Sequence, residues 1–250
     1  MKFASSSATF ADAFARGELT QLEWLDLCAN ELELDGVAFQ AAHFPRRDGE
    51  YLAQMKKAAA DLGLTVAALI ADGELAECEP WLEAANALGA PLLGVRAPAS
   101  GDDPAAWGRF ADALKGLAGA AKRVNVTLAL RPLPQTLCAD SADLARAAKD
   151  VDSAWLRYAP DPSALAPDER ERVLARSACA LHLMRDVERF AEADDAEAAA
   201  LLDGLARFRG FVVLDADPRP GWPRDAYHRA VERFAALRAQ RLTARPAAPA

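Results

Sequence analysis

Short apolar runs alternate along the chain with longer segments in which apolar residues recur every three or four positions. The first pattern is typical of buried strands and the second of amphipathic helices. Each pair of segments spans roughly 30 residues, the length of one βα unit. Eight runs are predicted to be strands: Lys2–Ser6, Leu34–Phe39, Leu64–Ile70, Pro91–Arg96, Val126–Arg131, Trp155–Ala159, Ala178–Met184 and Phe211–Asp215.

The periodic segments between these strands predict helices. Glycine follows the last apolar position at Leu62-Gly63, Leu88-Gly89 and Arg209-Gly210, where a helix end needs a left-handed residue. The predicted helices are Thr20–Leu32, Glu50–Leu62, Pro80–Leu88, Pro104–Lys122, Ser141–Lys149, Ala193–Phe208 and Arg224–Arg238.

Eight successive βα units without a linker favour a single closed (β/α)8 TIM barrel of the α/β class over an open, doubly wound sheet. The first strand runs into Ser5, Ser6 and Ser7, so the glycine-rich turn of a dinucleotide or phosphate loop is missing there. We expect the barrel to span residues 1–241. Residues 242–250, rich in Pro and Ala, are expected to form a disordered tail.

Composition and net charge limit the classes of molecule that the protein is expected to bind. The 250 residues carry a net charge of −8 with a pI near 5.0, which argues against binding to nucleic acid or to an anionic membrane. A small-molecule substrate fits better, and a homo-oligomer is compatible with the sequence. Because neither a secretory signal nor an apolar run near ~20 residues is visible, we expect a cytoplasmic protein. The four cysteines are scattered and predict reduced, structural thiols.

Four collinear stretches carry a family resemblance. They are LDGVAFQAAHFPRRDGEYLAQMKKAAADLGLTVAAL (34–69), EPWLEAANALGAPLLGVR (79–96), RVNVTLALR (123–131) and TLCADSADL (136–144). Their order and spacing resemble the sugar phosphate isomerase/epimerase proteins of the xylose isomerase-like barrel superfamily.

The resemblance implies a site at the C-terminal end of the barrel. Family members hold a divalent metal, such as Mn or Mg, through a Glu after the fifth strand, an Asp after the sixth, a His at the seventh and a Glu after the eighth. The two glutamates move a proton next to a carbonyl, and the metal polarises the oxygens.

This chain departs from that pattern at several positions. Arg131 stands where the family has the first Glu, and Asp215 stands in the second Glu position, one methylene shorter. Asp161 matches the family Asp. His182 matches the family His, but a one-residue offset would align Leu183 instead. If a metal is retained, Asp161, His182 and Asp215 are its expected ligands.

Arg131 changes the expected chemistry most. A guanidinium cannot donate a lone pair, and its charge repels a divalent ion by about 8 kcal/mol at 4 Å and an effective dielectric constant of 20. We therefore expect no metal, and an ion pair of Arg131 with Asp215, Asp161 or both. Arg131 is then either a structural ion-pairing residue or, together with Arg96, a clamp for a carboxylate or phosphate.

Four further assignments complete the predicted site. His182 and Asp215 are the candidate catalytic residues, although a histidine within an apolar strand can equally be a hydrogen-bonded core residue. His43, after the second strand, is a candidate substrate-binding residue or a loop residue that packs. Trp222, in a Pro/Gly loop after the eighth strand, could cover a substrate or cap the barrel.

Three functions remain open from the sequence. One is an isomerase or epimerase acting on a small sugar or hydroxy-carbonyl compound with a degenerate metal site. Another is a homologue that binds such a metabolite without turning it over. The third is an accessory subunit of a catalytic partner. Loss of both family glutamates argues against the standard two-base mechanism.

Overall fold

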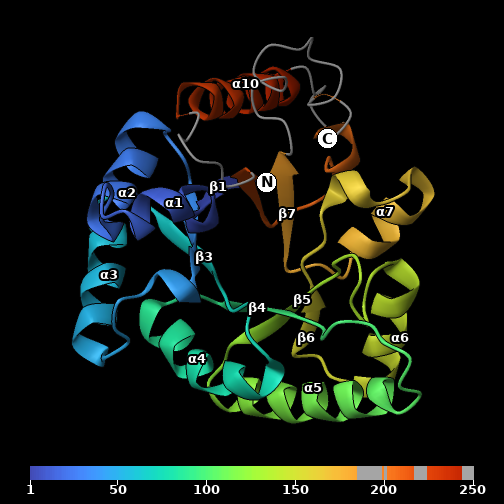
Figure 1. The fold of residues 1–250 in the computed structure, drawn as a ribbon. Helices are drawn as coiled ribbons and strands as arrows, with labels where there is room; N and C mark the ends of the chain where they lie inside the picture. The colour runs from blue at the N-terminus through green and yellow to red at the C-terminus, as the bar shows by residue number, and fades with distance from the viewer. Residues whose placement is uncertain (185–198, 200–201, 217–223, 244–250) are drawn as a thin grey trace, which may run out of the picture.

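Eight parallel strands form a nearly closed barrel in the computed structural model, which describes residues 1–184, 199, 202–216 and 224–243 (Figure 1). The strand order is β6-β5-β4-β3-β2-β1-β8-β7, and an isolated parallel bridge between Tyr158 and Ser177 joins the two ends. The strands are β1 (Lys2–Ser6), β2 (Gly36–Gln40), β3 (Thr65–Ile70), β4 (Leu92–Arg96), β5 (Thr127–Arg131), β6 (Leu156–Tyr158), β7 (Cys179–Met184) and β8 (Phe211–Ala216). The predicted single (β/α)8 barrel is confirmed.

Helices surround the strands as a ring (Figure 1). Short helical turns follow β1, β2 and β6: η1 (Ser7–Phe10), η3 (Ala41–His43) and η4 (Pro162–Ala164). The longer elements are α1 (Ala11–Ala15), α2 (Gln21–Asp26) with the π-helical turn η2 (Leu27–Glu31), α3 (Gly49–Asp61), α4 (Leu75–Leu88), α5 (Ala106–Arg123), α6 (Ser141–Val151), α7 (Pro167–Leu174) and α10 (Arg224–Thr243).

Local sequence explains several helix boundaries. Thr20 and Glu23 form a reciprocal capping box at the start of α2, and Asp48 and Asp140 accept backbone N–H bonds at the starts of α3 and α6. Gly89 ends α4 in the left-handed region, with φ +75°.

Three helix predictions differ from the structure. The predicted helix Thr20–Leu32 is divided into α2 and η2. Helix α4 begins at Leu75, five residues before Pro80, and contains that proline. The sequence indicated a start at Pro80 because Pro is frequent at the first position of a helix. Helix α10 continues to Thr243, beyond the predicted barrel end, and residues 244–250 lie outside the described residues. Part of Ala193–Phe208 also lies outside them.

Gly210 is needed because a side chain would not fit there, and not because the backbone is left-handed. The structure places only Gly17, Gly63 and Gly89 at positive φ among the described glycines, so the predicted left-handed residue at Gly210 is wrong. A Cβ atom on Gly210 would lie 2.6 Å from the ring of Phe208 and 2.9 Å from the carbonyl oxygen of Ala178. The glycine therefore allows the close approach of the chain to the start of β7.

Helix α10 closes the ring beside β1 and β8. The hydroxyl of Tyr227 lies 2.7 Å from the Ser5 hydroxyl and donates to the carbonyl oxygen of Leu214 at 3.0 Å. Near the other end of α10, Arg238 pairs with Asp35 at 2.7 Å, and Asp35 also accepts the backbone N–H of Phe3 at 2.8 Å. Polar contacts thus attach the last helix at both ends of the barrel wall.

The barrel interior is filled mainly by small side chains. Barrel interiors are usually dominated by bulky branched residues, whereas six of the ten buried residues of this inner cluster are alanine. A larger outer cluster lies between strands and helices and contains the aromatic residues Phe3, Phe10, Trp24 and Phe39. The buried members of the inner cluster are Ala4, Ala38, Ala67, Ala68, Ile70, Leu92, Ala129, Ala159, Cys179 and Val213.

Candidate functional site at the C-terminal end of the barrel

Polar residues take the next inward positions beyond the inner cluster. Because side chains alternate along a strand, residues two apart share a face. Ser6 follows Ala4 in this way, and Gln40 follows Ala38. We call the polar residues that lie on or just beyond the strand ends the polar layer: Ser6, Gln40, Asp72, Arg96, Arg131, Asp161 and Asp215.

Arg96 and Arg131 converge on one residue of the polar layer. They are register partners at the ends of β4 and β5. Nη1 of Arg131 forms an ion pair with Oδ1 of Asp72, and Nε of Arg96 donates to the backbone carbonyl oxygen of Asp72 at 2.6 Å. The Arg131 side chain is 17% exposed and that of Asp72 is 50% exposed, so the pair has one partly buried and one solvated partner.

The ion pair of Arg131 corrects the sequence prediction. Among the described residues Arg131 pairs with Asp72, not with Asp215 or Asp161. Asp72 follows β3 by two residues, and the sequence analysis missed it although a carboxylate ends that apolar run. The guanidinium still acts on Asp215 through its charge, which favours the carboxylate form. The two predicted arginines do come together, at the C-terminal ends of adjacent strands.

Asp215 is held in a hydrogen-bond network with β1 and η1. Its Oδ1 accepts from the hydroxyl of Thr9 at 2.7 Å and from the backbone N–H of Ala216 at 3.0 Å. Burial raises the pKa of the Asp215 carboxyl, and the hydrogen bond from Thr9, the charge of Arg131 and the hydroxyl of Ser6 partly oppose that rise. The group is thus fixed in position and shifted towards its protonated form.

Asp161 lies just beyond β6 and caps the turn that follows. Its Oδ1 accepts from the backbone N–H of Ser163 at 2.9 Å and from the Ser163 hydroxyl at 2.7 Å. The first residues of η4 are therefore positioned by the carboxylate that the family pattern assigns to the metal.

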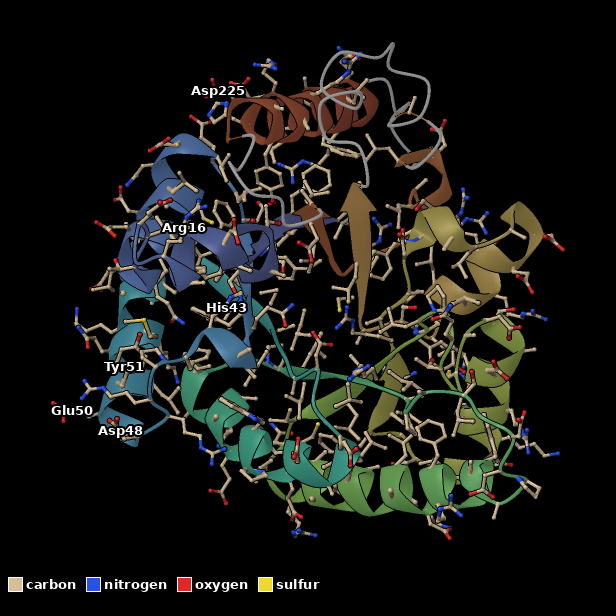
Figure 2. All side chains as sticks on the ribbon, viewed as in Figure 1. Arg16, His43, Asp48, Glu50, Tyr51 and Asp225 are labelled. Atoms are coloured by element: carbon tan, nitrogen blue, oxygen red, sulfur yellow. The ribbon has the colours of Figure 1, made fainter. Side chains whose placement is uncertain are left out.

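His43 stands in η3, directly after β2. Nδ1 lies 3.0 Å from the hydroxyl of Ser7, and the ring packs on Phe14 with centroids 5.1 Å apart. The side chain of Gln21 donates to the His43 carbonyl oxygen at 2.7 Å. Figure 2 shows His43 on the inner side of the helix ring, whereas Asp48, Glu50 and Tyr51 lie on its outer side. His43 is therefore held from three sides near the polar layer.

Gln40 is a second residue that the sequence analysis missed. It is 6% exposed at the end of β2, and its side-chain amide makes no hydrogen bond to another described residue. The amide nitrogen and oxygen of Gln40 are not fully buried, so they stay accessible at this position and are suited to bind a ligand oxygen. The signal in the sequence is a polar residue that ends an apolar strand.

Two predicted site residues are not placed by the structure. The side chain of His182 and the whole of Trp222 lie outside the described residues. The backbone register pairs His182 with Leu214 and Leu183 with Asp215. Asp215 belongs to the polar layer and Leu214 to the outer core, so it is Leu183 that is level with the polar layer. The role of His182 stays a prediction.

The described donors do not by themselves make up a divalent-metal site, and the side chain of the predicted ligand His182 lies outside the described residues. Within the described residues, no three side chains of His, Cys, Asp or Glu are grouped so that they could hold a metal. One oxygen of Asp215 is already bonded to Thr9 and Ala216, and the positive charge of Arg131 acts on this carboxylate. The four cysteines are buried and free.

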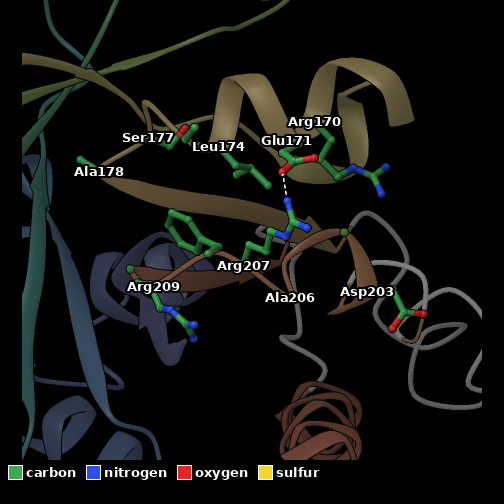
Figure 3. A pocket seen from close by; sticks show the side chains of 13 residues that line it. Arg170, Glu171, Leu174, Ser177, Ala178, Asp203, Ala206, Arg207 and Arg209 are labelled. Atoms are coloured by element: carbon green, nitrogen blue, oxygen red, sulfur yellow. Dashed lines mark hydrogen bonds and ion pairs between the residues drawn. The ribbon is translucent and has the colours of Figure 1, made fainter. Parts of the chain in front are cut away.

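A separate pocket lies at the opposite end of the barrel. It has a volume of about 920 Å³ and is lined by α7 and by residues around Ala178 and Gly210, which precede β7 and β8. The ion pair between Arg207 and Glu171 spans it (Figure 3). This pocket does not include any residue of the polar layer.

Because burial lowers the pKa of His43 below the usual value near 6.5, the unfolded chain binds a proton more readily than the folded one. We expect the free energy of unfolding to reach its full value above pH 6.5, where His43 is neutral in both states, and to decrease as the pH falls below 6.5. Urea unfolding between pH 5 and 7.5 should show this slope. The His43→Gln variant should lose that part of the slope, and an unchanged slope would contradict the assignment.

The fold and the polar layer define a (β/α)8 barrel with charged residues at the C-terminal ends of its strands. The chain belongs to the xylose isomerase-like TIM barrel family, whose model matches residues 27–190. The family resemblance found in the sequence is thereby confirmed. No curated protein matches the chain.

Solved structures agree with the fold. The apo crystal structure of the 3-keto-D-glucoside 4-epimerase YcjR from E. coli has a TM-score of 0.72 at 18% identity and covers 96% of this chain and 99% of its own. A structure of L-ribulose 3-epimerase has a TM-score of 0.73 at 14% identity, with 99% of both chains covered. The probable 3-DHS dehydratase AsbF from Bacillus anthracis has a TM-score of 0.74 at 12% identity and covers 94% and 99%. The described part of the chain contains no helix that could span a membrane.

Proposed function

We propose that this protein acts on a small sugar or hydroxy-carbonyl metabolite that carries an anionic group, and that Arg131 and Arg96 bind that group at the C-terminal end of the barrel. The observation that supports this proposal is the convergence of both arginines on Asp72. A planar guanidinium matches a carboxylate or phosphate through paired hydrogen bonds. The Asp72 carboxylate occupies the place that a ligand anion would take.

In this proposal the charge of Arg131 takes over the anion-binding part of a metal's role. Arg131 stands at the position where the family resemblance implies a metal-binding Glu. Because a guanidinium cannot ligate a metal, Arg131 and Arg96 bind the anionic group directly, by ion pairing and hydrogen bonding. The free amide of Gln40 is available to bind a hydroxyl or carbonyl oxygen of the same ligand. Asp215, with its pKa raised by burial, is available to donate a proton. His182 is the second acid-base group that the sequence predicts, although its register partner Leu214 belongs to the outer core.

Binding without turnover is the alternative, and one observation favours it. The standard reaction needs two glutamates, and this chain has Arg131 and Asp215 in their positions. A shorter carboxylate already bonded to Thr9 is a weak replacement for a free base.

Solvent exchange separates the two functions. The protein is incubated in deuterated water with a panel of ketoses, aldoses and their phosphates, with and without Mn²⁺ or Mg²⁺. Deuterium incorporation that is lost in Asp215→Ala and His182→Ala would support catalysis. Absence of exchange, combined with thermal stabilisation by an anionic member of the panel that depends on Arg131, would support binding alone. Thermal stabilisation by an anionic member of the panel that does not depend on Arg131 would contradict both the catalytic and the binding function.

The ion pair with Asp72 predicts a gain in affinity when that charge is removed. Asp72→Asn should strengthen binding of phosphoglycolate, a small anion with a carboxylate and a phosphate, by roughly 3- to 10-fold, because a half-exposed ion pair is worth about 1 kcal/mol. Isothermal titration measures the change. Asp103→Asn, which removes a similarly exposed partner of Arg109 on another part of the surface, should leave the affinity unchanged.

A further inference from the structure

Ser7 connects the ends of β1 and β2 through its hydroxyl. The side chain is 0% exposed, and its Oγ accepts the backbone N–H of Gln40 at 2.8 Å. The same Oγ lies 3.0 Å from Nδ1 of His43. These two contacts are the hydrogen bonds of the Ser7 hydroxyl within the described residues.

The hydrogen-bond inventory determines which atom of this pair donates. A serine hydroxyl has one proton to donate, and the contact with Gln40 uses Ser7 as an acceptor. If Nδ1 of His43 also donated to Oγ, the wholly buried Ser7 proton would have no acceptor among the described residues, which is unfavourable. The Ser7 hydroxyl therefore donates to Nδ1, and the neutral ring carries its proton on Nε2.

The environment keeps this ring neutral and in place. Burial lowers the pKa of His43, and no charged group contributes to the shift. Phe14 packs on the ring, and Gln21 holds the backbone carbonyl oxygen of the same residue. Nε2 lies on the far side of the ring from Ser7 and has no hydrogen-bond partner among the described residues. The neighbouring Gln40 amide likewise makes no hydrogen bond to a described residue, so two unused polar groups lie at the end of β2 and just after it.

We propose that His43 is the neutral hydrogen-bond donor of the site, with Ser7 as its positioning residue: Nε2–H binds a carbonyl or hydroxyl oxygen of the metabolite whose anionic group pairs with Arg131. A neutral imidazole that donates to a carbonyl oxygen stabilises negative charge as it develops there, without giving up its proton. The ligand part of this inference rests on the proposed function. The tautomer part does not.

The tautomer can be measured on the full chain without a ligand. The chain has three histidines, so two-bond ¹H–¹⁵N correlation spectra can be assigned with the His43→Gln variant. We expect His43 to show the Nε2–H tautomer at pH 7.5, and Ser7→Ala to shift the ring towards a mixture of tautomers. A His43 ring that is protonated on Nδ1, or a tautomer unchanged in Ser7→Ala, would overturn the positioning role of Ser7.

Binding of phosphoglycolate tests the ligand contact. Glutamine can place an N–H near the position of Nε2–H, whereas leucine cannot, so His43→Leu should bind the probe about 10-fold more weakly and His43→Gln within about 3-fold of wild type. Equal affinities of wild type and His43→Leu, with binding still dependent on Arg131, would overturn the inference and leave the proposed function intact. Absence of Arg131-dependent binding in the wild type would overturn the proposed function and with it the ligand contact.

Discussion

Replacement of Arg131 by methionine is expected to weaken phosphoglycolate binding by roughly 10- to 100-fold, because charged hydrogen bonds to an anion are each worth about 1.5–3 kcal/mol. Methionine keeps much of the apolar stem of arginine and removes only the guanidinium. The partner Asp72 is half exposed and can be solvated when Arg131 is gone, so the fold should keep its stability within about 1 kcal/mol.

Isothermal titration of wild type and Arg131→Met measures this loss. Arg123→Met is the matched control, since Arg123 is 68% exposed on α5 and pairs with the exposed Glu79. The control variant should bind the probe as wild type does. Equal affinity of Arg131→Met and wild type would mean that the arginines only connect strand ends.

The second large effect concerns stability. Gly36→Ala at the start of β2 should lower the free energy of unfolding by about 1–3 kcal/mol, and the melting temperature by roughly 3–10 °C, because overpacking forces backbone shifts. A Cβ atom there would clash with the carbonyl oxygen of Thr65 and lie 2.8 Å from Cε1 of Phe211. Neither neighbour can easily move, since Thr65 belongs to β3 and Phe211 to β8.

Gly116→Ala provides a matched change of opposite sign. Gly116 lies in the middle of α5 with no atom within 4 Å of an added Cβ, so alanine should stabilise the helix by up to about 1 kcal/mol. Thermal melts of both variants test the pair. A melting temperature of Gly36→Ala equal to that of wild type would contradict the close approach of β2 to its neighbours.

The sequence predicted most of the fold because the βα pattern is local. Each apolar run from Lys2–Ser6 to Phe211–Asp215 contains or overlaps an observed strand, and the order of eight units leaves few topologies. Boundaries were less predictable where two signals compete. Pro80 is a frequent first residue of a helix, yet the apolar positions before it extend α4 to Leu75.

The site was predicted only where residues lie at the C-terminal ends of strands. Arg96, Arg131 and Asp215 could be placed in this way, since strand ends converge in a barrel. Their partners could not. Asp72 and Arg131 are 59 residues apart and meet only through the register of β3, β4 and β5. The link between Ser7 and His43 likewise depends on the pairing of β1 with β2, which residue types alone do not specify.

The central claim is that Arg131 binds an anion at a position where relatives are expected to use a metal-binding Glu. Its most direct test is the affinity for phosphoglycolate measured by titration after treatment with EDTA, again after addition of Mn²⁺, and in Arg131→Met. We predict equal affinities with EDTA and with Mn²⁺, and a loss of roughly 10- to 100-fold in the variant. Stoichiometric Mn²⁺ that is released by Asp161→Asn or Asp215→Asn, together with probe binding only in its presence, would contradict the claim.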